Sequence, residues 1–418
     1  MSYTEKLIDF IGKSTDCYHA VKTAKDRLDE NGFTELLESD KWDVQSGGKY
    51  YVIRNSSSII AFEMPKKDFG AFMICASHTD SPSFKLKPDF EINADGCIKL
   101  SVEGYGGMIM SSWLDRPLSI SGRIVTAKNG KVETKLVNID RDLLVIPSLA
   151  IHMSRDINKG YEFNIRRDMC PIASEKNGRI EDIIAENVGV DKEEILGFDL
   201  SLYNRMRGTV LGADGEYFSA PRIDDLQCMY STLEGFLNSE SDDNVTVFAA
   251  FDNEEVGSGT KQGAKSSFLR DVLERICNNS ETYKRAVAKS FMLSCDNAHA
   301  VHPNFADKSD GTNRVYMNGG IVIKYNANQR YTTDAVSEAV VKYVCKNAGG
   351  PYQMYANRSD IPGGSTLGNL SNEKVSLNTA DIGLAQLAMH SSYETAGSRD
   401  TEYMVKMIKE FYKTEIVL

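Results

Sequence analysis

The sequence has little of what marks disordered, membrane-bound or secreted proteins. It contains only 10 prolines and 2 tryptophans in 418 residues and no compositionally biased tract, so we expect no large disordered region. No apolar run approaches the roughly 18 residues that a membrane-spanning helix needs. The segment after Met1 lacks the apolar core of a signal peptide. These absences predict a cytoplasmic protein without a membrane partner.

Positive charge is also scarce. The chain has 48 lysines and arginines against 59 aspartates and glutamates, which gives a formal net charge of −11. No run of basic residues is long enough to form a positively charged stripe. Proteins that bind nucleic acid need such a surface to neutralise phosphates. We therefore expect no nucleic-acid partner.

Paired cysteines are missing as well. The eight cysteines are scattered singly, without a Cys-x-x-Cys motif. We interpret them as reduced core residues, because a zinc knuckle or a redox site would need such a pair. Histidines are few: the six are at positions 19, 78, 152, 299, 302 and 390. Each histidine can therefore be judged by its own sequence context.

Chain length and pattern predict two domains. A single core stops growing at roughly 250–300 residues, and this chain has 418. Apolar runs of buried-strand length at 71–76, 245–251 and 291–295 alternate with helical stretches. This alternation is typical of an α/β sandwich around a largely parallel or mixed sheet. Residues 4–31 predict two helices, separated near Ser14 by residues that commonly cap helices.

Residues 84–203 have a different pattern. Short segments of alternating polar and apolar residues are separated by turn residues such as Asp95-Gly96, which indicates β-strands. Two helix-like stretches, at 179–187 and 191–196, interrupt this pattern. We interpret this region as a β-rich domain inserted into the first domain. The predicted first domain is therefore discontinuous and consists of residues 1–83 and 204–418.

Three buried-strand candidates are followed by residues that commonly bind metals. His78 ends the first, Glu254 and Glu255 follow the second, and Asp296 follows the third. Ligands of open α/β sheets bind at the carboxyl ends of strands, so we expect these side chains to converge in one cleft. Buried carboxylates need compensation by cations or metals. Asp80 is placed to fix the ring orientation of His78.

Each of these motifs has an ordinary alternative. A single histidine after a strand is more often a hydrogen-bonded loop residue, and adjacent glutamates usually form a solvated acidic pair. Taken together, histidine and carboxylate ligands suit zinc, manganese or cobalt rather than an iron–sulfur cluster. Two such metals would lower the pKa of a shared water and stabilise the oxyanion of a tetrahedral intermediate, which favours hydrolysis.

Five segments, taken in order, are specific enough to indicate a family. They are Ser77-His78-Thr79-Asp80-Ser81-Pro82, Ala220-Pro221-Arg222-Ile223-Asp224-Asp225-Leu226, Asp252-Asn253-Glu254-Glu255-Val256-Gly257-Ser258, Asp296-Asn297-Ala298-His299-Ala300-Val301-His302-Pro303-Asn304 and Ala388-Met389-His390-Ser391. The chain resembles the aspartyl aminopeptidases, dizinc metallopeptidases, over nearly its whole length. The resemblance implies a mixed-sheet α/β/α metallopeptidase domain with an inserted β-rich dimerisation domain. It also implies an enzyme that removes N-terminal residues from peptides and prefers Asp or Glu.

The resemblance implies a ligand set for two divalent metals, which would be zinc, with cobalt and manganese as alternatives. Asp224 would bridge both metals. His78 and Asp296 would complete one site, and Glu255 and His390 would complete the other. The peptide would be attacked by a hydroxide that bridges the two metals.

The same resemblance implies roles for four other side chains. Glu254 would be the general base that passes a proton to the leaving amine, and Asp80 would orient His78. His152 would reach a neighbouring subunit's active site, and Lys324 would meet the acidic side chain of the substrate. Outside the family, His152 would be a surface or packing histidine and Lys324 a solvated strand lysine. The implied assembly is a large homo-oligomer, a dodecamer.

Three rival functions stay open at this point. One is an aminopeptidase with broad or neutral preference, because specificity depends on few pocket contacts. Another is a dimetal amidohydrolase that acts on N-acyl amino acids and needs no free amine. The third is a binding protein without enzymatic activity, although all five implied ligands and the implied base are present in the sequence.

Overall fold

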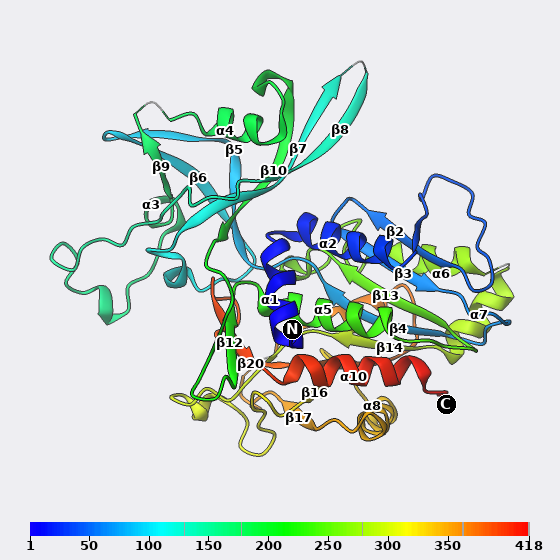
Figure 1. The fold of residues 1–418 in the computed structure, drawn as a ribbon. Helices are drawn as coiled ribbons and strands as arrows, with labels where there is room; N and C mark the ends of the chain where they lie inside the picture. Colours follow the sequence, from blue (N-terminus) through cyan, green and yellow to red (C-terminus); the bar gives the residue numbers. More distant parts are fainter. Residues whose placement is uncertain (129, 177, 278, 362, 417–418) are drawn as a thin grey trace.

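The computed structural model describes residues 1–416 except 129, 177, 278 and 362. Among these residues the strands form three sheets, of nine, six and five strands (Figure 1). The largest has the order β1-β2-β3-β13-β4-β14-β18-β16-β17. In that order its strands are Thr34–Glu35, Lys49–Arg54, Ser58–Glu63, Val245–Phe251, Phe72–His78, Phe291–Cys295, Asn378–Gly383, Ile321–Tyr325 and Tyr352–Ala356.

The centre of the nine-stranded sheet is parallel. Strands β13, β4, β14 and β18 are neighbours and all run in the same direction. Every residue of β4 and β13 is buried, as expected for parallel strands that are covered on both faces. The three apolar runs at 71–76, 245–251 and 291–295 are thus neighbouring strands, and their carboxyl ends lie at one edge of the sheet.

Helices cover both faces of this sheet, so the predicted α/β/α sandwich is confirmed. One core cluster unites one face with α1, α2, α5, α8 and α10, and a second unites the other face with α6, α7 and α9. These helices are Tyr3–Lys13, Cys17–Glu30, Ile223–Leu237, Ala335–Ala348 and Asp400–Lys413, then Phe268–Ile276, Ser280–Lys289 and Leu367–Ser371. Within the described part of the chain, no helix combines the length and the apolar character needed to cross a membrane.

The two N-terminal helices form where the sequence predicts them. Helix α1 begins with a capping box, in which the side chain of Ser2 accepts from the amide of Glu5 and the side chain of Glu5 accepts from the amide of Ser2. Helix α2 begins after Asp16, whose carboxylate accepts from the amides of Tyr18 and His19. These two caps account for the break near Ser14.

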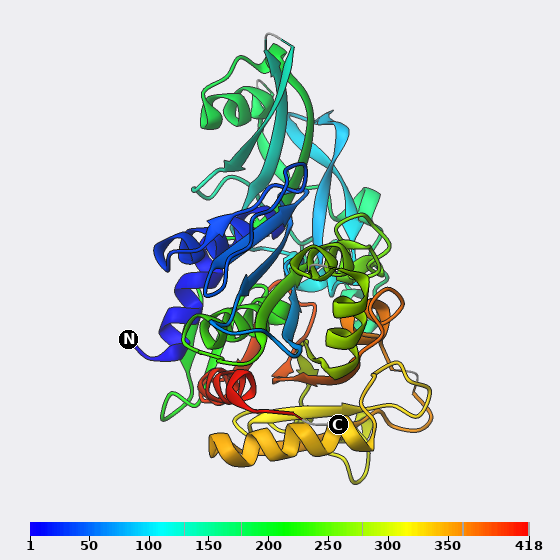
Figure 2. The ribbon, with the colours of Figure 1, turned by 90° about the vertical axis from the view of Figure 1, so that its right-hand side faces the viewer.

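The six-stranded sheet is antiparallel and has the order β8-β7-β10-β5-β6-β9. Its strands are, in that order, Lys131–Asn138, Leu118–Lys128, Ile195–Asn204, Ser83–Ala94, Cys97–Tyr105 and Ile172–Glu175. Its core includes residues of α4, Ile180–Val188. Figure 2 shows it at one end of the molecule, in cyan and green, with α8 in orange at the other. The predicted helix-like stretch at 191–196 is wrong, because only Lys192–Glu194 form a 3-10 turn before β10 begins.

The five-stranded sheet was not predicted. Its order is β11-β12-β20-β19-β15. The strands are Thr209–Leu211, Tyr217–Ala220, Glu394–Gly397, Ala385–Leu387 and Ala298–His299. Three connections at this sheet hold predicted ligands: Asp224 follows β12, His390 lies between β19 and β20, and Asp296 precedes β15. This small sheet therefore matters for the site.

Candidate metal centre

Four site residues lie at the carboxyl edge of the nine-stranded sheet. His78 is the last residue of β4, opposite Phe251, the last residue of β13. Glu254 and Glu255 begin a 3-10 turn, Glu254–Val256, just after β13. Asp296 directly follows β14. The register of three parallel strands thus brings these side chains to one place, as the carboxyl-end rule predicts.

Two further predicted ligands come from irregular backbone next to the five-stranded sheet. Asp224 lies at the start of α5 with a non-helical conformation, φ −81° and ψ 109°. His390 lies between β19 and β20 with φ +67°, the left-handed region that non-glycine residues seldom occupy. The left-handed backbone of His390 persists only where surrounding contacts hold it, and such backbone often occurs at functional sites.

The ligand atoms of these residues converge. His78 Nε2 lies 3.5 Å from Asp224 Oδ1, and His390 Nε2 lies 3.5 Å from Asp224 Oδ2. Asp224 therefore presents one oxygen to each histidine. His390 Nε2 also lies 3.3 Å from Glu255 Oε2. Three overlapping groups have ligand atoms within 4.8 Å of one another: His78 with Asp224, Asp225 and Asp296; His78 with Glu254 and Glu255; and Asp224 with Glu255 and His390.

The cluster carries more buried negative charge than the protein compensates. Asp224 Oδ1 and Glu255 Oε1 are buried without a hydrogen-bond partner in the described part of the chain. Burial and the neighbouring carboxylate of Asp224 raise the pKa of Glu255 well above its usual range. Carboxylate oxygens that lack donors, next to imidazole nitrogens, are the donor set that divalent metals such as zinc prefer. The residues present therefore fit a metal centre.

Asp80 connects His78 to the glutamate turn. His78 Nδ1 lies 3.0 Å from the backbone oxygen of Asp80 and 3.4 Å from its Oδ1. The two carboxylate oxygens of Asp80 accept from the amides of Glu254 and Glu255, at 3.1 and 3.2 Å. Burial, together with Asp296 and Asp80, raises the pKa of Glu254 to about 8, and cations bound nearby would lower it.

Lys324 lies beside the cluster, and His152 lies outside it. Lys324, on β16, is only 3% exposed. Its Nζ donates to the backbone oxygen of Asn297 at 2.8 Å and lies 3.4 Å from Asp296 Oδ1. His152 is exposed on the connection after β8, flanked by the exposed side chains of Ile151 and Met153. None of the three groups of potential metal ligands described above includes His152.

Sequence reasoning missed several residues that contact the cluster. Asp225 is fully buried, and its Oδ2 accepts from the amide of His78 at 3.1 Å. In the sequence, only its position next to Asp224 could have indicated that Asp225 belongs to the site. Tyr105, Gly107 and Glu394 also contact site residues across long sequence separations, and no local pattern marks them.

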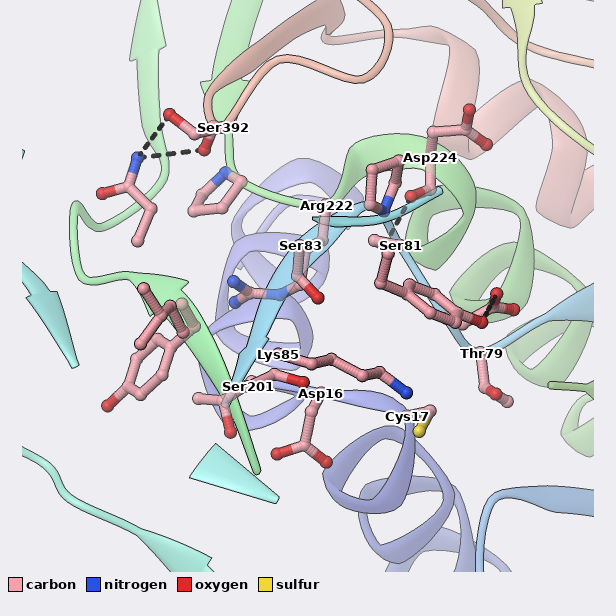
Figure 3. Close-up of a pocket in the computed structure, with 18 of the residues that line it drawn as sticks. Asp16, Cys17, Thr79, Ser81, Ser83, Lys85, Ser201, Arg222, Asp224 and Ser392 are labelled. Atoms are coloured by element: carbon pink, nitrogen blue, oxygen red, sulfur yellow. Dashed lines mark hydrogen bonds between the residues drawn. The ribbon is translucent and has the colours of Figure 1, made fainter. Parts of the chain in front are cut away.

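A small cavity of about 50 Å³ lies behind Asp224. Figure 3 shows residues from several elements lining it: Asp16 and Cys17 at the start of α2, Lys85 on β5, and Ser201 on β10. Ser81 donates to the backbone oxygen of Asp224 at 2.7 Å. The cavity beside Asp224 is therefore lined both by residues near the carboxyl edge of the nine-stranded sheet and by residues of the six-stranded sheet.

A buried histidine and carboxylates at the carboxyl edge of the sheet, with a second histidine beside them, suit a metal-dependent hydrolase. The profile of the family described as Aminopeptidase I zinc metalloprotease (M18) matches residues 10–412. The chain therefore belongs to the M18 family of zinc aminopeptidases. The family predicted from the five sequence segments is confirmed.

Relatives and solved structures agree with this assignment. A Clostridium acetobutylicum protein named "Probable M18 family aminopeptidase 2" is 45% identical over 430 residues, which cover 99% of each chain. A structure described as the Ape4 and Nbr1 complex has a TM-score of 0.95 and 34% identity, over 98% of this chain and 85% of that one. The mApe1 dodecamer of S. cerevisiae has a TM-score of 0.86 and 29% identity, over 98% and 96%.

Proposed function

We propose that this M18 protein is a two-metal aminopeptidase that removes acidic N-terminal residues, Asp or Glu, from peptides. The observation that carries the proposal is the convergence of two histidines and three carboxylates next to a fourth carboxylate, that of Glu254. The five ligands would be His78, Asp224, Glu255, Asp296 and His390. The metals would be zinc, with cobalt and manganese as alternatives that the same donors accept.

The position of Asp224 supports its role as the bridging ligand. Because its two oxygens face His78 and His390 separately, one carboxylate can serve two sites. His78 and Asp296 would complete one site, and Glu255 and His390 the other. Bound there, divalent metals would lower the pKa of water and polarise the peptide carbonyl.

Glu254 is suited to move protons at this site. It belongs to the same group of ligand-type atoms as His78 and Glu255, and its amide is fixed by Asp80. In the proposed mechanism, Glu254 takes a proton from the attacking water and passes it to the leaving amine, a role for which a carboxylate needs a pKa near the working pH. Asp80 holds the ring of His78 so that Nε2 faces the cluster.

Lys324 is the proposed recognition residue for an acidic substrate side chain. A lysine ammonium has three donors, and the contacts to Asn297 and Asp296 leave one for the substrate. A buried cation next to the cluster would favour Asp or Glu over an uncharged residue at the substrate N-terminus. A neutral or broad preference is the alternative.

The proposed assembly is a large homo-oligomer, a dodecamer as in the yeast mApe1 structure. His152 would then act in a neighbouring subunit's site, which is consistent with its exposure and its absence from the cluster of its own chain. In this proposal, residues 84–203 form the inserted dimerisation domain, and residues 1–83 and 204–418 form the catalytic domain. The cytoplasmic location stays a prediction.

Metal analysis of the purified protein tests the core of the proposal. We expect two metals per chain, and a chelator should remove metals and activity together, with both restored by added zinc. Glu254→Gln should retain the metals and lower kcat by about 10²–10⁴-fold, because it lacks a general base. Glu274→Gln, an exposed glutamate on α6, is the control. Peptide hydrolysis by Glu254→Gln at the parent's rate would refute the mechanism.

Substrate preference needs its own measurement. Matched peptide-like substrates with N-terminal Asp, Asn and Leu should be compared, since Asn has the shape of Asp without its charge. We expect Asp to be released fastest, and equal rates for the three would refute the acidic preference. Acetylation of the substrate amine should abolish turnover; continued turnover would favour the N-acyl amidohydrolase instead.

A further inference from the structure

Glu394 is a buried carboxylate that touches the backbone of two proposed ligands. It is the first residue of β20 and only 2% exposed. Its Oε2 accepts from the amide of Asp224 at 3.1 Å, and its Oε1 accepts from the amide of His390 at 2.7 Å. One side chain therefore joins two segments that are 166 positions apart in the sequence numbering, 224 and 390.

The five-stranded sheet explains how Glu394 reaches both segments. Strand β20 pairs with β12, so that Glu394 lies opposite Ala220, shortly before Asp224 in the sequence. Strand β20 also pairs with β19, and His390 lies in the connection between them. Asp224 leaves the helical conformation within α5, and His390 has φ +67°, in the left-handed region. The backbone of His390 needs neighbouring contacts that hold it in place.

A buried hydrogen-bond relay extends from Glu394 to the third ligand segment. Gln386 Nε2 donates to Glu394 Oε1 at 3.3 Å, and Asn297 Nδ2 donates to Gln386 Oε1 at 2.8 Å. Asn297 directly follows Asp296, and its backbone oxygen accepts from Lys324. Buried networks whose members are all partnered make an arrangement rigid and unique.

We propose that Glu394 is the positioning residue that sets the metal affinity of this site, by holding the backbone of Asp224 and His390 through its two oxygens. The inference depends on the proposed metal site. This role requires a side chain at position 394 that accepts hydrogen bonds at two atoms. A carboxylate is an acceptor at both oxygens, whereas an amide offers one acceptor and one donor group. A glutamine there would turn its NH₂ toward one of the two backbone N–H groups.

Asp400 provides a matched control, because it makes the same kind of double contact to backbone that carries no proposed ligand. It is fully buried, and its two oxygens accept from the amides of Asn318 and Gly320, at 2.6 and 2.9 Å. Asp400→Asn removes the same type of double acceptor as Glu394→Gln. The two variants should lose similar stability in the metal-free form, while their metal affinities should differ.

The experiment measures zinc affinity by competition with a chelator of known strength, together with metal-free and zinc-loaded Tm. We expect Glu394→Gln to bind zinc about 10–100-fold more weakly than the parent, the usual effect of losing a contact that orients a ligand. Its kcat should fall at limiting zinc and recover in excess zinc, with KM little changed. Asp400→Asn should retain the parent's affinity.

Several outcomes would overturn the inference. Parent-like zinc affinity in Glu394→Gln would do so, and so would an equal loss in Asp400→Asn, which would indicate general destabilisation. If Glu394→Gln is insoluble, Gln386→Met is tested instead, because it removes the donor to Glu394. We expect a smaller loss of zinc affinity in this variant, of roughly two- to tenfold, because Gln386 does not contact a proposed ligand directly. Unchanged affinity in that variant would contradict the relay. A parent that binds no zinc would refute the proposed function itself.

Discussion

The nine-stranded and six-stranded sheets contribute to the site in different ways. In the nine-stranded sheet, β4 and β13 are buried along their whole length, and their carboxyl ends point into the site. In the six-stranded sheet, β6 alternates between buried and more exposed residues, as expected for an antiparallel strand with one core face. None of the five proposed ligands lies on the six-stranded sheet.

The six-stranded sheet still reaches the cluster through the end of β6. Tyr105 OH donates to Asp80 Oδ2 at 2.6 Å and accepts from Asn253. Two residues later, the backbone oxygen of Gly107 lies 2.6 Å from His390 Nδ1, a contact that leaves Nε2 free to face a metal. One region thus supplies the proposed ligands, and the other contacts the residues that hold them. This division teaches that a region without proposed ligands can still shape the candidate site.

Among residues 84–203 the largest expected effect concerns His152, because a catalytic group from this region would break the division between the two sheets. His152→Ala should lower kcat by about 10²–10³-fold, the usual loss when a group that stabilises the transition state is removed. Arg155→Ala, in the same exposed connection, is the control. The measurement is kcat for peptide substrates, at full metal occupancy.

Subunit mixing then locates the site in which His152 acts. Inactive Glu254→Gln and His152→Ala subunits, dissociated and reassembled together, should regain part of the activity if His152 serves a neighbouring subunit. Unchanged kcat in His152→Ala alone would remove it from the mechanism. A low kcat without any recovery on mixing would place its action within its own chain.

A smaller effect is expected when the hydroxyl of Tyr105 is removed. Tyr105→Phe takes one donor from Asp80, so the carboxylate that orients His78 and the glutamate turn is held less firmly. We expect zinc affinity to fall by about tenfold, the low end for a contact one step removed from the ligands. Chelator competition measures this affinity directly.

Tyr203→Phe is the matched control for Tyr105→Phe. Tyr203 is a buried tyrosine of the same sheet, on β10, and its hydroxyl donates to Asn138 Oδ1 at 2.9 Å. Its loss should lower stability without changing zinc affinity. If both variants bind zinc like the parent, Tyr105 has only a structural role, and orientation of the site from this end of the six-stranded sheet is reduced to Gly107, just after β6.

That the polar side chains at the carboxyl edge lie together could be predicted from the sequence, because long buried strands have a strong pattern. The runs before His78, Glu255 and Asp296 are continuous and apolar, and strand ends in parallel sheets lie at a common edge. The same strength of pattern explains why the α/β/α sandwich and the first two helices were predicted. Both kinds of inference use residues that are close together in the sequence.

The remaining contacts could not be predicted in this way. Asp224 and His390 lie next to strands of three or four residues, too short to show a period, and only the family resemblance implied them. Tyr105 and Glu394 also make hydrogen bonds to residues far away in the sequence, such as Asp80 and Asp224. Such contacts depend on how three sheets are placed, which no local pattern encodes.

The smallest effect is expected at Gly106, where the backbone of the six-stranded region approaches the glutamate turn most closely. Gly106 has φ +71°, and a Cβ there would lie 3.1 Å from Glu255 Cβ. Gly96, in the turn between β5 and β6, has φ +96°, and a Cβ there would meet nothing within 4 Å beyond its chain neighbours. Alanine at either position should cost about 1–2 kcal/mol of unfolding free energy, because both require the left-handed conformation.

Only the variant at Gly106 should also change the site. Gly106→Ala must displace Glu255 by a few tenths of an ångström, whereas Gly96→Ala has open space. We therefore expect a loss of kcat of roughly two- to tenfold in Gly106→Ala alone, although both variants should lose similar Tm. The kcat values of the two variants, measured at saturating zinc, show whether the loss comes from the contact with Glu255 or from backbone strain at the glycine. An equal loss in both would mean that backbone strain is the cause. No loss in either would mean that this end of the six-stranded sheet acts on the proposed ligands only through Tyr105, at the end of β6, and Gly107, just after it.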